Sequence, residues 1–157
     1  MPASITTEAV WTEIRKRNFA ILSWLSAGGA PRSAGVVYHV EDRSLYIGSE
    51  AQAFKVRQIA RDPRTSLVIT VPRGTWLPIA IPDATISCGA TAEVLSADEA
   101  GESVGRALTA GMANPDEMRA RMAVLRVTPV GEFLTYGIGV SLLAMRDPEL
   151  ASGRVAV

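Results

Sequence analysis

The sequence predicts a mainly β, α+β fold, in which six or seven short antiparallel strands form a closed or partly closed barrel with small peripheral helices. First, apolar and β-branched runs are separated by short turns, which favours antiparallel pairing of neighbouring strands. Second, the chain lacks the regular alternation of strands with long helices that parallel α/β folds need. Third, its 157 residues are 48% hydrophobic and 20% charged, which suits a single domain over residues 1–157 with a sizeable core.

The chain is expected to begin with a helix over residues 7–17, which Thr6 or Thr7 can cap. The barrel core then covers about 19–140, and a polar tail over 146–157 contributes one helical turn. Glycine-rich and polar turns separate the strands. The expected strands cover residues 19–25, 32–40, 44–48, 65–71, 84–95 and 124–128, and a seventh covers 132–140.

Two further helices are expected between the last long strands. Ser96 with Glu99 three residues later has the spacing of a capping box, and predicts a helix to about Ala110. Pro115 at a first helical turn, with acidic residues after it, predicts a second and shorter helix. Gly89, inside the preceding strand, indicates a bulge or a point of close approach.

The residues after the third strand carry the clearest functional signal. Ser49 has Gln52 three residues on, so we expect Ser49 to cap a helix over 50–61. The free N–H groups and dipole of a helix start attract anions, and Lys55 and Arg57 add two cations, so a phosphate is the natural guest. Taken alone, the pattern is more often a capped helix with a solvated, charged face.

The segment over residues 72–83 is more apolar than an ordinary loop, and its three prolines forbid a central strand or a helix. An apolar loop must cover the core, a partner subunit or a bound ligand. Core cover or subunit contact is favoured over a ligand lid. Trp76 within this loop is likewise favoured to pack rather than to stack on a bound ring.

Composition excludes several classes of function. The formal net charge of zero argues against nucleic acid as the main partner. Cys88 is the only cysteine, so no intrachain disulfide can form, and its apolar run favours a core position. With His39 as the only histidine, a protein zinc site or a serine hydrolase triad is not expected. No signal peptide or membrane-spanning run is found, so we expect a cytoplasmic protein without membrane contacts.

Four expected elements follow one another in a characteristic order. They are a strand, a Gly-x-Pro turn with a second strand, a third strand ending in serine, and a basic helix ending in Asp-Pro-Arg. This order resembles the pyridoxamine 5′-phosphate oxidase-like, FMN-binding split-barrel superfamily and its F420-dependent branch. The combination is specific, although no single piece is diagnostic. The stretches that carry it are 19–23, 28–38, 45–49 and 55–67, with further likeness at 89–93 and 125–129.

The resemblance implies a homodimer with two cofactor sites at the subunit interface, and FMN or coenzyme F420 as the cofactor. The phosphate would rest near Ser49, Lys55 and Arg57, and the ring would lie against the second and third strands. Arg32 is either a surface charge or a second phosphate contact. The cofactor-binding residues that the resemblance implies are Arg32, Ser33, Ala34, Gly35, Val36, Ile47, Gly48, Ser49, Lys55, Arg57 and Trp76.

Three functions remain open. The first is a flavin- or deazaflavin-dependent oxidoreductase that transfers a hydride to or from a small planar hydrophobic substrate; the cofactor carries the chemistry, so no protein residue is assigned as catalytic. The second is a non-catalytic binding protein for the cofactor or for haem, with His39 as the only histidine available as a ligand, although an edge-strand role is favoured for it. The third is a cofactor-free dimeric interaction domain. The C-terminal Arg-x-His clamp of true pyridoxamine phosphate oxidases is missing, so that substrate is not expected.

Overall fold

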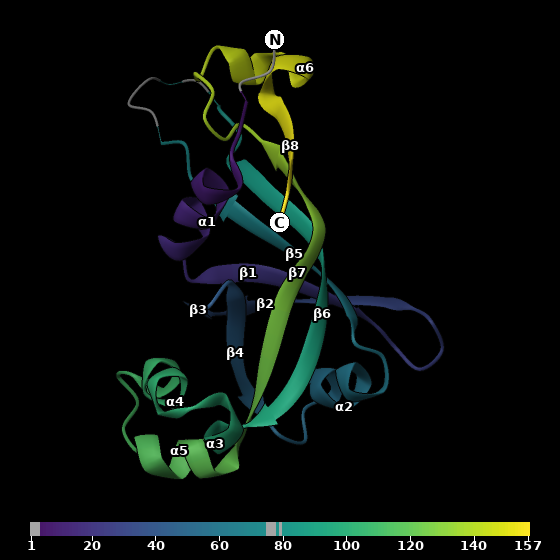
Figure 1. Ribbon diagram of the computed structural model, residues 1–157, viewed down its shortest axis with the longest axis vertical. Coiled ribbons are helices and arrows are strands. Elements are labelled where there is room, and N and C mark those ends of the chain that lie inside the picture. Colours follow the sequence, from purple (N-terminus) through teal and green to yellow (C-terminus); the bar gives the residue numbers. More distant parts are fainter. Residues whose placement is uncertain (1–3, 75–77, 79) are drawn as a thin grey trace.

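One antiparallel sheet of eight strands dominates the structure (Figure 1). The computed structural model describes residues 4–74, 78 and 80–157. Seven strands follow the order β2-β1-β5-β6-β7-β4-β3, and β8 pairs with β7. The predicted mainly β, α+β fold is confirmed, with one strand more than expected. The strands are β1 (Phe19–Leu25), β2 (Pro31–Val37), β3 (His39–Glu41), β4 (Ser44–Glu50), β5 (Arg64–Val71), β6 (Ala84–Ser96), β7 (Met122–Tyr136) and β8 (Ser152–Ala156).

The sheet curls so that its two ends meet without pairing. β2 and β3, at opposite ends of the strand order, are joined through Tyr38, whose N–H donates to the Asn18 carbonyl oxygen at 2.8 Å. The single strand expected over 32–40 is therefore two strands. β2 lies beside β4, but the two share no hydrogen-bonded ladder. We call the gap between β2 and β4 the seam.

The inward face of the sheet and helix α1 (Thr7–Arg15) form the core. The predicted cap at Thr6 is confirmed, because its hydroxyl accepts a hydrogen bond from the Ala9 N–H at 3.2 Å. Trp11 of α1 meets the ring of Phe133 edge-on, with centroids 5.7 Å apart. Burial alternates along β1, so one face of this strand is buried in the core.

Two smaller expectations about the long strands are confirmed. The register of β6 and β7 shifts between Cys88 and Gly89, at the predicted bulge. Cys88 is buried, and burial raises the pKa of its thiol to about 12, which keeps it protonated and unreactive at neutral pH.

Helix α2 (Phe54–Arg61) starts later than the sequence predicts, and Ser49 does not cap it. β4 continues through Ser49 and Glu50, which pair with β7. The long partner strand holds in extended form two residues whose local pattern favours a helix start, so tertiary pairing overrides local preference. Gln58 Oε1 of α2 accepts the N–H of Ala27 at 2.6 Å, which ties the β1–β2 turn to this helix.

Three short helices leave the sheet between β6 and β7 and gather at one end of these strands (Figure 1). The predicted capping box of Ser96 and Glu99 is present. The single helix expected to about Ala110 is wrong, because Gly101 adopts a φ of +94° and breaks it in two. The third helix begins at the predicted proline. The three helices are α3 (Ala97–Ala100), α4 (Glu102–Thr109) and α5 (Pro115–Arg121).

The C-terminal residues add a strand that the sequence does not predict. β7 ends at Tyr136, so the strand expected to continue to residue 140 is wrong beyond that point. The short helices η1 (Ala144–Arg146) and α6 (Pro148–Ala151) follow, and β8 then pairs with the end of β7. β8 was missed because it is short, and its side chains are only half-buried or exposed, which leaves little apolar pattern to detect.

The apolar loop over residues 72–83 is described only in part, and Trp76 lies outside the described residues, so its packing stays a prediction. At the start of this loop, the guanidinium of Arg73 donates to the carbonyl oxygen of Val140 at 2.5 Å. Within the described part of the chain, no helix is both long and apolar enough to cross a membrane.

Candidate functional site

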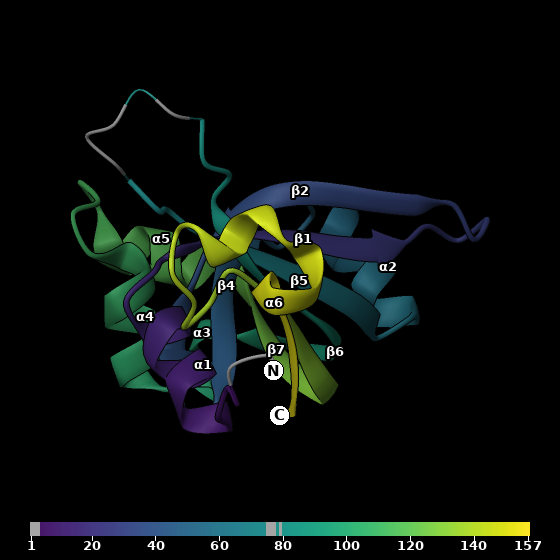
Figure 2. The same ribbon diagram turned by 90° about the horizontal axis from the view of Figure 1, so that it is seen from above.

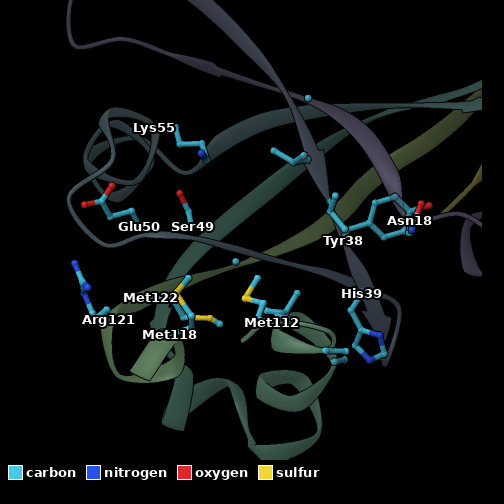
Figure 3. Close-up of a pocket in the computed structure, with 17 residues that line it drawn as sticks. Asn18, Tyr38, His39, Ser49, Glu50, Lys55, Met112, Met118, Arg121 and Met122 are labelled. Atoms are coloured by element: carbon cyan, nitrogen blue, oxygen red, sulfur yellow. The ribbon is translucent and has the colours of Figure 1, made fainter. Parts of the chain in front are cut away.

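A cavity of about 910 Å³ opens at the seam (Figure 3). This volume lies at the upper end of the usual range for small-molecule sites. One side of the cavity consists of β2, β4 and the start of α2, and we call it the strand wall. The other side consists of α4, α5, the residues that join these two helices and the first residue of β7, and we call it the helix wall.

The strand wall presents unpaired main-chain edges to the cavity. Among the strands that the structure describes, β2 is hydrogen-bonded only to β1. β4 pairs with β7 on one side over residues 45–50, but on its other side β3 reaches only as far as Tyr46. In the described sheet, alternate residues within 35–37 and 48–50 therefore turn N–H and C=O groups to the seam that no neighbouring strand satisfies, although the Glu50 carbonyl oxygen accepts the Ala53 N–H at 3.0 Å. Such edges can hydrogen-bond the polar atoms of a planar ring.

One end of the cavity suits an anion. Ser49 at the end of β4 and Lys55 in the first turn of α2 both line it, on the same side as Arg121 (Figure 3). The first turn also leaves N–H groups without partners inside the helix, and its dipole favours negative charge. No ion pair between described residues includes Lys55. Arg121 lies 3.6 Å from Glu117, and Glu50 is the one acidic side chain among the described lining residues.

The opposite end carries Asn18, Tyr38 and His39 (Figure 3). The Tyr38 hydroxyl donates to the Ile14 carbonyl oxygen at 2.7 Å, and burial raises its pKa well above the usual range. Tyr38 therefore stays protonated and ties α1 to the seam. His39 is half-buried on the edge strand β3, as predicted, with Nε2 3.7 Å from the Glu41 carboxylate.

The helix wall is apolar and rich in methionine. Met112, Met118 and Met122 line it together with Leu108. The wall approaches β4 at Gly48, where a Cβ built on the glycine would meet Met122 Cε at 3.7 Å and Leu108 Cβ at 3.8 Å, which are ordinary van der Waals distances. The cavity is thus polar along its strand edges and at its ends, and apolar on the helix side.

The structure brings some of the predicted cofactor residues to the cavity and leaves others elsewhere. Those in the lining are Gly35, Val36, Gly48, Ser49 and Lys55. The first residues of β2 lie toward the tip of the β1–β2 hairpin, which extends away from α4 and α5 (Figure 2). Predicted residues outside the lining are Arg32, Ser33 and Ala34 of β2, Ile47 in the core and Arg57 on the exposed face of α2.

The sequence did not predict that the helix wall, Asn18 and Tyr38 belong to the site. One signal was available: three of the five methionines of the chain fall within residues 112–122. Methionine in a short polar stretch between strands is unusual, because such stretches are normally solvated.

The sequence profile of the family described as "Pyridoxamine 5′-phosphate oxidase" matches residues 6–135, which is most of the chain. A search of curated proteins found no match. The family match thus covers α1, the barrel as far as β7 and both walls of the cavity.

Several solved structures are similar. The conserved hypothetical protein Rv2991 from Mycobacterium tuberculosis has a TM-score of 0.66 at 18% identity, covering 80% of this chain and 81% of that one. The haem storage protein HutZ from Vibrio cholerae has a TM-score of 0.68 at 16% identity, covering 86% and 98%. An F420 reductase has a TM-score of 0.59 at 12% identity, covering 78% and 93%. At these identities the likeness shows the fold alone.

Proposed function

Because this chain belongs to the pyridoxamine 5′-phosphate oxidase family, we propose that the cavity at the seam binds FMN or coenzyme F420, and that the protein is an oxidoreductase acting on a small planar hydrophobic substrate. The observation that carries the proposal is the position of Ser49 and Lys55 at one end of a cavity bounded by unpaired strand edges. A ligand with a phosphate at one end and a planar, hydrogen-bonding ring at the other matches that arrangement.

The residues present fit such a ligand. The Lys55 ammonium, the Ser49 hydroxyl and the first-turn N–H groups of α2 would hold the phosphate. The main-chain edges at residues 35–37 and 48–50 would bind and orient the ring. When bound, a flavin or deazaflavin supplies the hydride-transfer chemistry, and the cavity walls exclude water from it. The proposal assigns no acid or base to the protein.

A homodimer is part of this proposal. Phe19 and Val37, which are cross-strand partners, are large apolar residues exposed to solvent, and so are Val130 and Leu134 of β7. Exposed apolar side chains on a sheet favour contact with another protein surface. Since Val37 also lines the cavity, a partner seated on β2 would help to close it. Light scattering should give twice the chain mass, and Val37→Lys should lower that mass; a monomeric wild-type protein would remove this part of the proposal.

Haem binding is the second candidate, and His39 favours it. It is the only histidine of the chain, it lines the cavity, and it lies at the end opposite Lys55 and Arg121 (Figure 3). An imidazole at one end and cations at the other suit an iron ligand and carboxylate side groups. Both haem-storage and F420-reductase structures share the fold, so the fold does not choose between the two functions.

The visible spectrum of the purified protein tests the two candidates together. Any released small molecule is identified by mass, and the empty protein is titrated with FMN, F420 and haem separately. We expect micromolar or tighter binding of FMN or F420, with loss of affinity in Lys55→Ala. A haem spectrum that disappears in His39→Ala would support the second candidate, and a protein that binds none of the three would contradict both.

A further inference from the structure

The helix wall carries an unusual concentration of methionine. Of the five methionines in the chain, Met112, Met118 and Met122 all line the seam cavity. Figure 3 shows their side chains in the part of the wall between Arg121 and His39. Another member of the five, Met145, is buried in the core instead. Met122 packs against the smaller core cluster, whereas Met112 and Met118 belong to neither core cluster.

The three side chains are not equivalent. Met122 is half-buried and packs near Gly48, so it has a structural partner. Met112 and Met118 are 45% and 42% exposed, so much of their apolar surface faces the cavity or solvent. Leaving apolar surface in water forgoes about 25 cal/mol per Å² of burial, which a bound ligand can recover.

Methionine also determines what kind of ligand suits the wall. Its unbranched side chain and polarisable sulfur adapt to different shapes and make favourable contacts with aromatic rings. No charged side chain lies on the wall between Arg121 and His39 in the described lining. A charged or strongly hydrated ligand would lose hydration there without a partner to replace it. A flat, uncharged aromatic molecule would lose little.

We propose that Met112 and Met118 form the substrate-binding face of the cavity, and that they bind flat, uncharged aromatic molecules of varied outline next to the cofactor. The inference rests on the proposed function, because it assigns the strand wall to the cofactor and the facing helix wall to the second molecule. It narrows that molecule to uncharged aromatic rings of varied outline and adds the two residues that select it. Selection follows from apolar contact and adaptability rather than from a hydrogen-bonded handle.

Equilibrium dialysis with 1,4-naphthoquinone as the probe tests the inference, using oxidised cofactor so that no turnover occurs. The probe is dialysed against protein loaded with FMN or F420 and against unloaded protein. The test variant is Met112→Gln/Met118→Gln, which keeps the side-chain length but adds polar amides. A matched variant, Met112→Leu/Met118→Leu, keeps the wall apolar. The surface control is Leu143→Gln, because Leu143 is 78% exposed and lies outside the lining.

The glutamine pair should raise the dissociation constant of the probe about tenfold, which corresponds to about 1.4 kcal/mol. The leucine pair and Leu143→Gln should change the dissociation constant of the probe by less than about twofold. Cofactor affinity and the mass of the assembled protein in solution should stay the same in every variant. Equal probe affinity in the wild type and the glutamine pair would overturn the inference. It would also be overturned if the glutamine pair changed the mass of the assembled protein and left the probe affinity unchanged. Failure of the wild type to bind FMN or F420 would instead overturn the proposed function. Dialysis of the unloaded protein would then still show whether Met112 and Met118 bind the probe.

Discussion

The two walls of the seam cavity are built on different principles. The strand wall is made of main chain, and buried side chains of the same strands, such as Ile47 of β4, anchor it to the core. The helix wall is made of side chains from the helical segment between β6 and β7. Within this segment, α5 has no buried residue. The first wall is fixed by ladders on β1 and β7, whereas the second can change shape by changing methionine rotamers.

This difference suggests a division of labour. A cofactor that must be held in one orientation needs rigid, hydrogen-bonding elements, and strand edges supply them. A substrate that varies in outline is better served by a soft apolar surface. If the walls differ in this way, substitutions on the strand wall should affect stability and cofactor affinity, and those on the helix wall should affect neither.

The largest effect is expected for the support of the strand wall. Ile47→Ala removes a fully buried side chain and should lower the free energy of unfolding by about 2–5 kcal/mol. Met118→Ala removes a side chain that is 42% exposed and should cost less than about 1 kcal/mol. Urea unfolding of both variants measures the contrast. Equal costs would show that the helix wall is as firmly built as the strand wall.

The next effect concerns cofactor affinity. Lys55→Ala should weaken binding of FMN or F420 by about 1.5–3 kcal/mol, the range for a hydrogen bond to a charged group. Arg57→Ala should leave affinity nearly unchanged, because Arg57 is exposed and outside the lining. Lys16→Ala is the matched control, since Lys16 is the only other lysine and pairs with Glu13 on α1. Equal losses in all three variants would point to general electrostatic attraction rather than a site.

The smallest effect is a pH dependence at the far end of α2, the helix that carries Lys55. Asp62 accepts hydrogen bonds from the side chain and the N–H of Arg64, and these lower the pKa of its carboxyl from 3.8 to about 2. A lowered pKa in the folded state adds stability above about pH 4 that is lost as the pH falls toward 2. Because the group is exposed, the effect should be small.

Melting temperatures measured between pH 7 and pH 2 test this. Asp62→Asn should melt below wild type at neutral pH, and the gap should close as the pH falls toward 2. A gap that stays constant over that range would mean that the carboxylate charge plays no part.

Sequence reasoning found the barrel but only half of the site, and the reasons are local. Strands such as β1 and β5 are coded by contiguous apolar residues, so their position is visible without tertiary information. Ser49 shows the limit, because its capping pattern is overridden by pairing with β7. The helix wall depends on how α4 folds back over β3 and β4 and on how α5 packs against α4, and no local pattern specifies those contacts.

Cofactor-dependent hydrogen exchange tests the division between the walls most directly. Amide exchange is measured in the purified protein with and without saturating FMN or F420. We predict that cofactor slows exchange at residues 35–37, 48–50 and the first turn of α2, while amides of α4 and α5 change little. Protection concentrated on α4 and α5, with unchanged exchange along β2 and β4, would contradict the account.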